Sequence, residues 1–215
     1  MKDIKGVIFD FDGTIADSSY VWDKVDRAFF ARRNMEIPLD YVENISTMSL
    51  QQGAEYTKNK YNLNEKIEDI IAEWNECAIF EYEKNVKLKP YAKDYICYLK
   101  ENNYKIGLAT ASDPCFYTPV LKREGIFNHF DAFLDGSVNN IKGKDFPDFY
   151  IECANRMGVL PKHCRVYEDI IKGIRSAKLA NMEVFGVYNN TNEAMWEEIK
   201  NTAHGYIFSF AELIK

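Results

Sequence analysis

The amino-acid sequence predicts an α/β fold in which a parallel sheet carries helices on both faces and a helical unit is inserted near the start. Beyond Pro90, short apolar segments alternate with amphipathic segments at helical spacing. This alternation is typical of parallel strands joined by right-handed crossovers. From about residue 18 to residue 84, in contrast, no segment has the pattern of a strand. A chain of 215 residues is long enough for a sheet domain and a smaller inserted unit.

The first predicted element is a short buried strand. Val7, Ile8 and Phe9 form a continuous apolar run, as expected of a strand that is covered on both faces. The run ends at Asp10, and Asp12 follows only two positions later. Because one strand cannot form a sheet alone, we expect it to join the strands beyond Pro90, which makes the helical unit an insertion.

The inserted unit is predicted to begin with a helix. Asp17, Ser18 and Ser19 suit a helix N-cap, and apolar residues recur at helical spacing from Val21 to Phe29. Two further helices are predicted, over residues 50–62 and 64–84. The predicted domains are residues 1–16 together with 86–215 for the sheet, and residues 17–85 for the helical unit.

The remaining elements alternate along the chain. Strands are predicted at residues 104–110, 130–135, 164–169, 183–187 and 205–208. Helices are predicted at residues 91–103, 114–125, 147–158, 171–181 and around 193–200. Ligands bind at the carboxyl ends of the strands in open parallel sheets, so these strand ends are where a site is expected.

Composition and charge exclude several classes of partner. The net charge of −6 leaves no basic surface for nucleic acid or an anionic membrane, and no apolar run is long enough to span a membrane. The five cysteines are scattered without a CxxC pair, and no signal-peptide-like segment is found, which indicates reduced thiols in the cytoplasm. The three histidines lie in no metal-ligand pattern, so no zinc site is expected. The oligomeric state is left open.

Polar residues follow four of the predicted strands. The groups are Asp10 and Asp12, then Thr110 and Ser112, then Gly143 and Lys144, and finally Glu168 and Asp169. Four carboxylates in one crevice would repel one another and raise each other's pKa unless a cation lay among them. Oxygen ligands without histidine or cysteine select a hard ion, and Mg²⁺ suits a site that also holds a phosphate.

The same strand ends offer groups that bind a phosphate. Thr110 provides a hydroxyl, Ala111 and Ser112 provide backbone N–H groups near the start of a helix, and Lys144 provides a positive charge. Two aspartates that are two positions apart can then divide the chemistry. One attacks phosphorus, and the other carries protons for the leaving group and for water.

Four ordered motifs carry a family resemblance: "DFDGT", "ATAS", "GKDFPDFY" and "VYEDIIKGIRSAKLANMEVFGV". Together they resemble the motifs of the haloacid dehalogenase-like phosphohydrolases, in the branch with a helical cap inserted after the first motif. The resemblance spans residues 5 to about 188. It implies a Rossmann-like core with an inserted α-helical cap domain, and a phosphatase that acts on a small phosphorylated metabolite with Mg²⁺ as cofactor.

The resemblance also implies roles for individual residues. Asp10 would be the nucleophile that forms an aspartyl-phosphate, and Asp12 the general acid and base. The metal ligands would be Asp10, the backbone carbonyl of Asp12, and Asp169, with Glu168 as a further ligand or helper. The transferring phosphoryl group would be bound by Thr110 and Lys144, with Ala111 and Ser112 beside it.

Two alternatives differ from a phosphatase. A sugar-phosphate mutase of the β-phosphoglucomutase type resembles this chain in its cap topology, but Trp22 and Leu50 stand where that pattern has a histidine and an arginine. A non-catalytic binding protein of the same fold is the second alternative. It has no evident need for Asp10 and Asp12 together.

Overall fold

The computed structural model describes residues 3–38, 40–45, 48–137 and 143–214. The chain forms two compact units, which are described separately. The core unit consists of Met1–Ser19 and Val86–Lys215, and the helical unit of Tyr20–Asn85. None of the helices in the described ranges is both long and apolar enough to cross a membrane.

The core unit is built on a parallel sheet of six strands within the described residues, as the sequence predicts. The strands are β1 (Gly6–Phe9), β4 (Lys105–Ala109), β5 (Ala132–Leu134), β6 (Cys164–Glu168), β7 (Glu183–Val187) and β8 (Gly205–Ile207). Their order is β5-β4-β1-β6-β7-β8, and all neighbouring pairs are parallel. The first strand therefore lies in the middle. The strand order changes direction around β1, which places a crevice at its carboxyl end.

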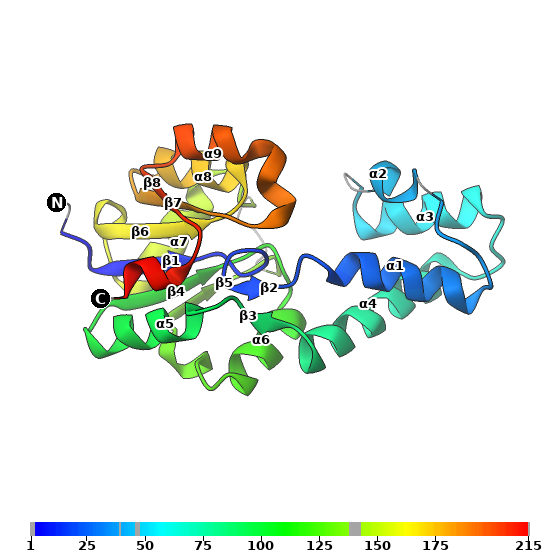
Figure 1. The fold of residues 1–215 in the computed structure, drawn as a ribbon, viewed down its shortest axis with the longest axis horizontal. Coiled ribbons are helices and arrows are strands. Elements are labelled where there is room, and N and C mark those ends of the chain that lie inside the picture. Colours follow the sequence, from blue (N-terminus) through cyan, green and yellow to red (C-terminus); the bar gives the residue numbers. More distant parts are fainter. Residues whose placement is uncertain (1–2, 39, 46–47, 138–142, 215) are drawn as a thin grey trace. The chain divides into compact units, whose positions relative to one another are not determined.

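Helices cover both faces of this sheet (Figure 1). They are α5 (Ala92–Glu101), α6 (Pro114–Arg123), α7 (Pro147–Met157), α8 (Ile171–Leu179) and α9 (Trp196–Thr202). Side chains from α7, α8 and α9 share one apolar cluster with Ile8 and Val166. The opposite face is aromatic, because Phe9 stacks on Tyr167 at 5.3 Å between ring centroids and also meets Tyr95 of α5. Adjacent residues of β1 thus point into different layers, as the pleat of a strand requires.

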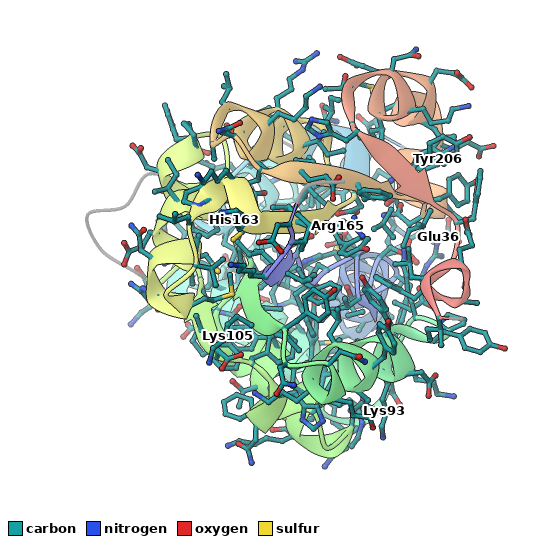
Figure 2. All side chains as sticks on the ribbon, turned by 90° about the vertical axis from the view of Figure 1, so that its left-hand side faces the viewer. Glu36, Lys93, Lys105, His163, Arg165 and Tyr206 are labelled. Carbon is teal, nitrogen blue, oxygen red and sulfur yellow. The ribbon has the colours of Figure 1, made fainter. Side chains whose placement is uncertain are left out.

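The other end of the sheet carries the amino ends of the strands. Figure 2 views this face, on which Lys105 of β4, Arg165 of β6 and the preceding His163 are labelled. Arg165 pairs with Glu183 at 2.6 Å and lies over the ring of Phe185. None of the residues that were predicted to carry chemistry belongs to this end.

The segment after β1 differs from the sequence prediction. The predicted N-cap at Asp17–Ser19 is wrong, because helix α1 begins at Val21 and its N-cap position is Tyr20, without a side-chain capping bond. Asp17 belongs instead to a short strand, β2 (Ala16–Asp17), which pairs antiparallel with β3 (Lys87–Leu88). The two segments that join the units are therefore hydrogen-bonded to each other.

The helical unit contains four helices in the residues described. They are α1 (Val21–Arg32), α2 (Tyr41–Ile45), α3 (Leu50–Lys60) and α4 (Ile67–Lys84). Aromatic rings fill its core: Phe29 meets Trp74 edge-on at 5.5 Å, and Phe30 meets Tyr41 at 4.8 Å. The buried position of Trp74 identifies it as part of this core.

One acidic side chain of α1 is buried in the helical unit. Asp26 is only 6% exposed. Burial raises the pKa of Asp26 to about 7, and the negative charge of Asp23 on the same helix adds to the effect. In the unfolded chain an aspartate titrates near 3.9. Between about pH 4 and pH 7 the folded protein therefore keeps a proton that the unfolded chain has released, so stability falls as the pH rises through this window.

We predict that Asp26→Asn removes this pH dependence. The amide is neutral at every pH, so the variant should gain up to about 4 kcal/mol in free energy of unfolding over the wild type near pH 8, because the pKa shift is about three units, and almost nothing near pH 4. Urea denaturation at several pH values measures this, with Asp69→Asn on the exposed side of α4 as control. A gain that does not change with pH would contradict the assignment.

Candidate active site

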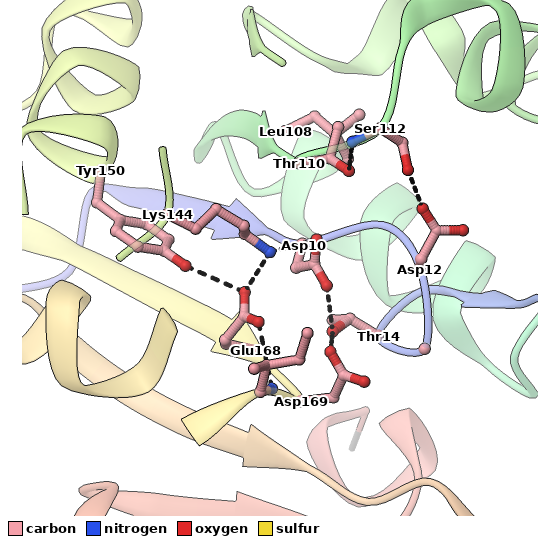
Figure 3. A network of polar contacts seen from close by, with 12 residues as sticks. Asp10, Asp12, Thr14, Leu108, Thr110, Ser112, Lys144, Tyr150, Glu168 and Asp169 are labelled. Atoms are coloured by element: carbon pink, nitrogen blue, oxygen red, sulfur yellow. Dashed lines mark hydrogen bonds and ion pairs between the residues drawn. The ribbon is translucent and has the colours of Figure 1, made fainter. Parts of the chain in front are cut away.

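Polar residues from separate parts of the core unit meet at the carboxyl ends of its central strands. Asp10 follows β1, and Thr110 follows β4. Glu168 is the last residue of β6, and Asp169 comes directly after it. Lys144 reaches the same place from the segment before α7 (Figure 3). Residues from all four sequence motifs thus lie together.

Three buried carboxylates form the centre of this site, and we call them the acidic group: Asp10, Glu168 and Asp169. Each offers an oxygen within 4.8 Å of an oxygen of the other two. The Lys144 ammonium lies 2.6 Å from Asp10 Oδ1 and 2.8 Å from Glu168 Oε2. Burial would lower the pKa of Lys144, but the two carboxylates outweigh it and hold that pKa above its usual range. Lys144 is therefore charged.

Glu168 is held by donors on both of its oxygens. Its Oε2 accepts hydrogen bonds from Lys144 and from the phenol of Tyr150 at 3.1 Å, and its Oε1 accepts from the backbone N–H of Ile170 at 3.2 Å. Burial raises the pKa of Glu168 to about 7, and the charge of Asp10 adds to the rise, whereas Lys144 opposes it. The arrangement makes Glu168 an anchor for the Lys144 ammonium.

Asp169 and Asp10 share a hydroxyl group. The Thr14 hydroxyl lies 3.2 Å from Asp10 Oδ2 and 3.1 Å from Asp169 Oδ1. A hydroxyl has one proton, so it can donate to only one of the two carboxylates at a time. Burial, followed by the charges of Asp10 and Glu168, raises the pKa of Asp169 well above its usual range.

The donor set of the acidic group fits a divalent cation. Within the described part of the chain, Lys144 is the only ammonium in ion-pair contact with these three carboxylates. Ionised, the group would keep a net charge of about −2, and buried like charges at such spacing disfavour one another unless a cation lies among them. The donors are all oxygen atoms, which suits Mg²⁺ better than a softer metal.

Asp12 has a different environment from the acidic group. Its Oδ1 accepts a hydrogen bond of 2.6 Å from Ser18, and its Oδ2 accepts one from the Ser112 hydroxyl. Its carboxylate is therefore held between the segment after β2 and the loop after β4. Figure 3 shows the contact with Ser112. The metal contact through the backbone carbonyl of Asp12 stays a prediction.

The turn after Asp12 brings two parts of the site close together. Gly13 has φ +73°, a left-handed conformation that favours glycine. A Cβ atom on Gly13 would lie 2.3 Å from Asp169 Oδ2. The backbone N–H groups of Thr14, Ile15 and Ala16 all bond to the carbonyl of Phe11, so this is a compact turn.

The predicted phosphate-binding segment follows β4. Thr110 is buried, and its Oγ1 accepts the backbone N–H of Ser112 at 3.1 Å. Ala111 between them is exposed, and helix α6 starts shortly afterwards at Pro114. The segment contacts Asp12, because the Ser112 hydroxyl donates a hydrogen bond to the Asp12 carboxylate.

Sequence reasoning missed several polar residues of the site. Thr14 could have been found, because it completes the "DFDGT" motif and is one turn away from Asp10. Tyr150 lies in "GKDFPDFY", where an aromatic residue also suits a core helix. Asn189 and Asn192 had no signal, because an asparagine-rich segment is typical of a solvated turn.

Comparisons with known proteins show the family of the chain. A family model described as haloacid dehalogenase-like hydrolase matches residues 4–181. Hexitol phosphatase B of Escherichia coli (strain K12) is 30% identical over 188 residues, which cover 84% of this chain and 82% of that protein. Beta-phosphoglucomutase of Bacillus subtilis is 29% identical over 194 residues, which cover 86% and 83%.

A solved structure supports the same relationship. A HAD hydrolase of family IA, variant 3, from Entamoeba histolytica superposes with a TM-score of 0.79 at 25% sequence identity, covering 97% of this chain and 95% of the other. The family model covers most of the chain, and the parallel sheet has the fold of these neighbours. The chain therefore belongs to the haloacid dehalogenase-like hydrolase family, and it is an enzyme of the phosphatase type within that family.

Proposed function

We propose that this protein is a Mg²⁺-dependent phosphatase that hydrolyses a small phosphorylated metabolite through an aspartyl-phosphate on Asp10. The observation that carries the proposal is the position of Asp10. It ends the central strand of the sheet, buried in the acidic group, with the Lys144 ammonium at 2.6 Å. This arrangement suits a nucleophile that must meet a phosphoryl group whose negative charge is offset by nearby cations.

The reaction has two steps in this proposal. The Asp10 carboxylate forms a bond to phosphorus while the bond from phosphorus to the ester oxygen breaks, and Asp12 gives that oxygen a proton. Water then attacks phosphorus, loses a proton to Asp12, and releases inorganic phosphate with the Asp10 carboxylate restored. Ser18 and Ser112 fix the carboxylate of Asp12 for these transfers.

The other residues bind and orient. Lys144 and Thr110 would hold the phosphoryl oxygens, with backbone N–H groups of Ala111 and Ser112 beside them. Asp10 and Asp169 would hold Mg²⁺, together with the carbonyl of Asp12, while Glu168 keeps Lys144 in place. The bound cation would offset the negative charge of the phosphoryl group.

The names of related proteins support a phosphorylated sugar or sugar alcohol as the substrate class. The chain is similar to proteins named hexitol phosphatase B and phosphorylated carbohydrates phosphatase. We propose that the helical unit, Tyr20–Asn85, is the cap domain that contributes to substrate choice.

A sugar-phosphate mutase is the second candidate, because the chain is also similar to beta-phosphoglucomutase. A mutase must hold the sugar phosphate and keep water from the phospho-aspartate until a second hydroxyl accepts the phosphoryl group. Trp22 and Leu50 are both 40% exposed, and neither offers the charged donor that a second phosphate group requires. These two side chains favour the phosphatase.

We predict that Asp10→Asn lowers turnover of an aryl phosphate by about 10³-fold or more, because an amide cannot attack phosphorus. Circular dichroism should show an unchanged fold. The control is Asp131→Asn. This aspartate lies at the amino ends of the strands, where it pairs with Lys105, so the variant should keep its activity. Substantial turnover by Asp10→Asn would refute the nucleophile assignment.

We predict that beryllium fluoride, a mimic of the phosphoryl group, binds only when Mg²⁺ is present. The acidic group repels an anion until the cation and Lys144 offset its charge. Calorimetric titrations with Mg²⁺ and with EDTA measure this for the wild type, for Lys144→Met and for the exposed control Lys172→Met. The control should bind like the wild type, and Lys144→Met should not bind. Binding that persists in EDTA would be inconsistent with the proposed metal site.

We predict that β-glucose 1-phosphate yields inorganic phosphate or no reaction, and not glucose 6-phosphate. The reason is the absence of a charged donor at Trp22 and Leu50. Phosphorus NMR distinguishes the products directly. Glucose 6-phosphate that accumulates faster than free phosphate would identify a mutase.

A further inference from the structure

Two buried asparagines in the loop after β7 have no part in the proposed reaction. Asn189 is 7% exposed and Asn192 is 8% exposed. They form a capping box at the start of the 3₁₀ turn Asn190–Met195, in which the side chain of each accepts the backbone N–H of the other. This capping role accounts for the hydrogen bonds that their side-chain oxygens accept. It does not account for the hydrogen bonds that their side-chain NH₂ groups donate.

The orientation of the Asn189 amide is fixed by its neighbours. Its Oδ1 accepts from the backbone N–H of Thr191 at 2.8 Å, from the Thr191 hydroxyl, and from the backbone N–H of Asn192 at 2.9 Å. Three donors meet at this atom, so it must be the oxygen. The NH₂ group therefore faces the opposite way. There it donates to Asp169 Oδ2 and, at 3.3 Å, to the carbonyl of Gly13.

The side chain of Asn192 contacts the backbone of the same aspartate, Asp169. Its Nδ2 donates to the carbonyl of Asp169 at 3.0 Å and to the carbonyl of Val187 at 2.9 Å. One loop thus holds both the carboxylate and the main chain of Asp169. Asn189 donates to Oδ2, whereas the other oxygen, Oδ1, lies 3.1 Å from the Thr14 hydroxyl, which also contacts Asp10.

We propose that Asn189 and Asn192 form a clamp that positions Asp169 to present Oδ1 to a divalent cation. This inference rests on the proposed function, because it assumes that a cation binds at the acidic group. Neutral amide donors suit the task. A lysine or arginine at position 189 would orient the carboxylate equally well, but its positive charge would oppose the binding of the cation.

Asn189→Ser separates the clamp from the capping role. A serine hydroxyl can still cap the 3₁₀ turn, but it is too short to donate to Asp169. The matched control is Asn190→Ser, which changes an exposed asparagine in the same loop. Binding of Mn²⁺ without substrate is followed by electron paramagnetic resonance, and thermal unfolding is measured in parallel with and without the metal.

The clamp predicts that Asn189→Ser weakens Mn²⁺ binding by roughly 10- to 100-fold, as is typical when a partner of a metal ligand is removed. Asn190→Ser should bind as the wild type does. Equal Mn²⁺ affinity in Asn189→Ser and wild type would overturn the clamp and leave the proposed function intact. A wild type that binds no Mn²⁺ would overturn both.

Asn189→Thr, which has the same capping hydroxyl, is the second variant if Asn189→Ser does not fold. Failure of both variants to fold would show that Asn189 has a structural role and would overturn the clamp.

Discussion

The close burial of Asp10, Glu168 and Asp169 is the constraint on which the rest of the core unit depends. An ionised carboxylate that leaves water loses several kcal/mol of solvation unless donors replace the water. The structure supplies these donors from every side: an ammonium from the segment before α7, a phenol from α7, a backbone N–H after β6 and a hydroxyl after β1. The loops at this end of the sheet therefore carry the groups that donate hydrogen bonds to the oxygens of the three carboxylates.

The turn at Gly13 shows how little space this arrangement leaves. Asp10 must lie close to Asp169 if both are to hold one ion, and the chain must still reach Asp12 two residues later. The left-handed glycine lets the backbone pass directly against Asp169 Oδ2, where any Cβ atom would collide. Asp12 then lies outside the acidic group, between Ser18 and Ser112, where its carboxylate is separated from the other three.

The sheet could be predicted from the sequence because short, largely apolar segments alternate with helical patterns, and polar residues stand at the ends of the central strands. Asp10, Thr110, Glu168 and Asp169 could be found for the same reason, since they mark the strand ends. The ribbon of β2 and β3 could not be predicted, because strands of two residues have no periodic pattern. Ser18 suggested a helix cap, but its hydroxyl is bonded to Asp12. The bonds of Asn189 and Asn192 to Asp169 depend on how a distant loop folds back, which local sequence does not encode.

The central position of β1 has a consequence for how the chain folds. The strand that precedes Asp10, the proposed nucleophile, is made before its two neighbours in the sheet, which begin at Lys105 and Cys164, far along the chain. Closing such long loops is slow, because the entropy of the intervening chain is lost before the strands gain any contact. The helical unit, in contrast, is one continuous segment with its own aromatic core. During synthesis it emerges whole while β1 is still unpaired, so the apolar strand at the start of the chain must remain protected from aggregation until β6 has been made.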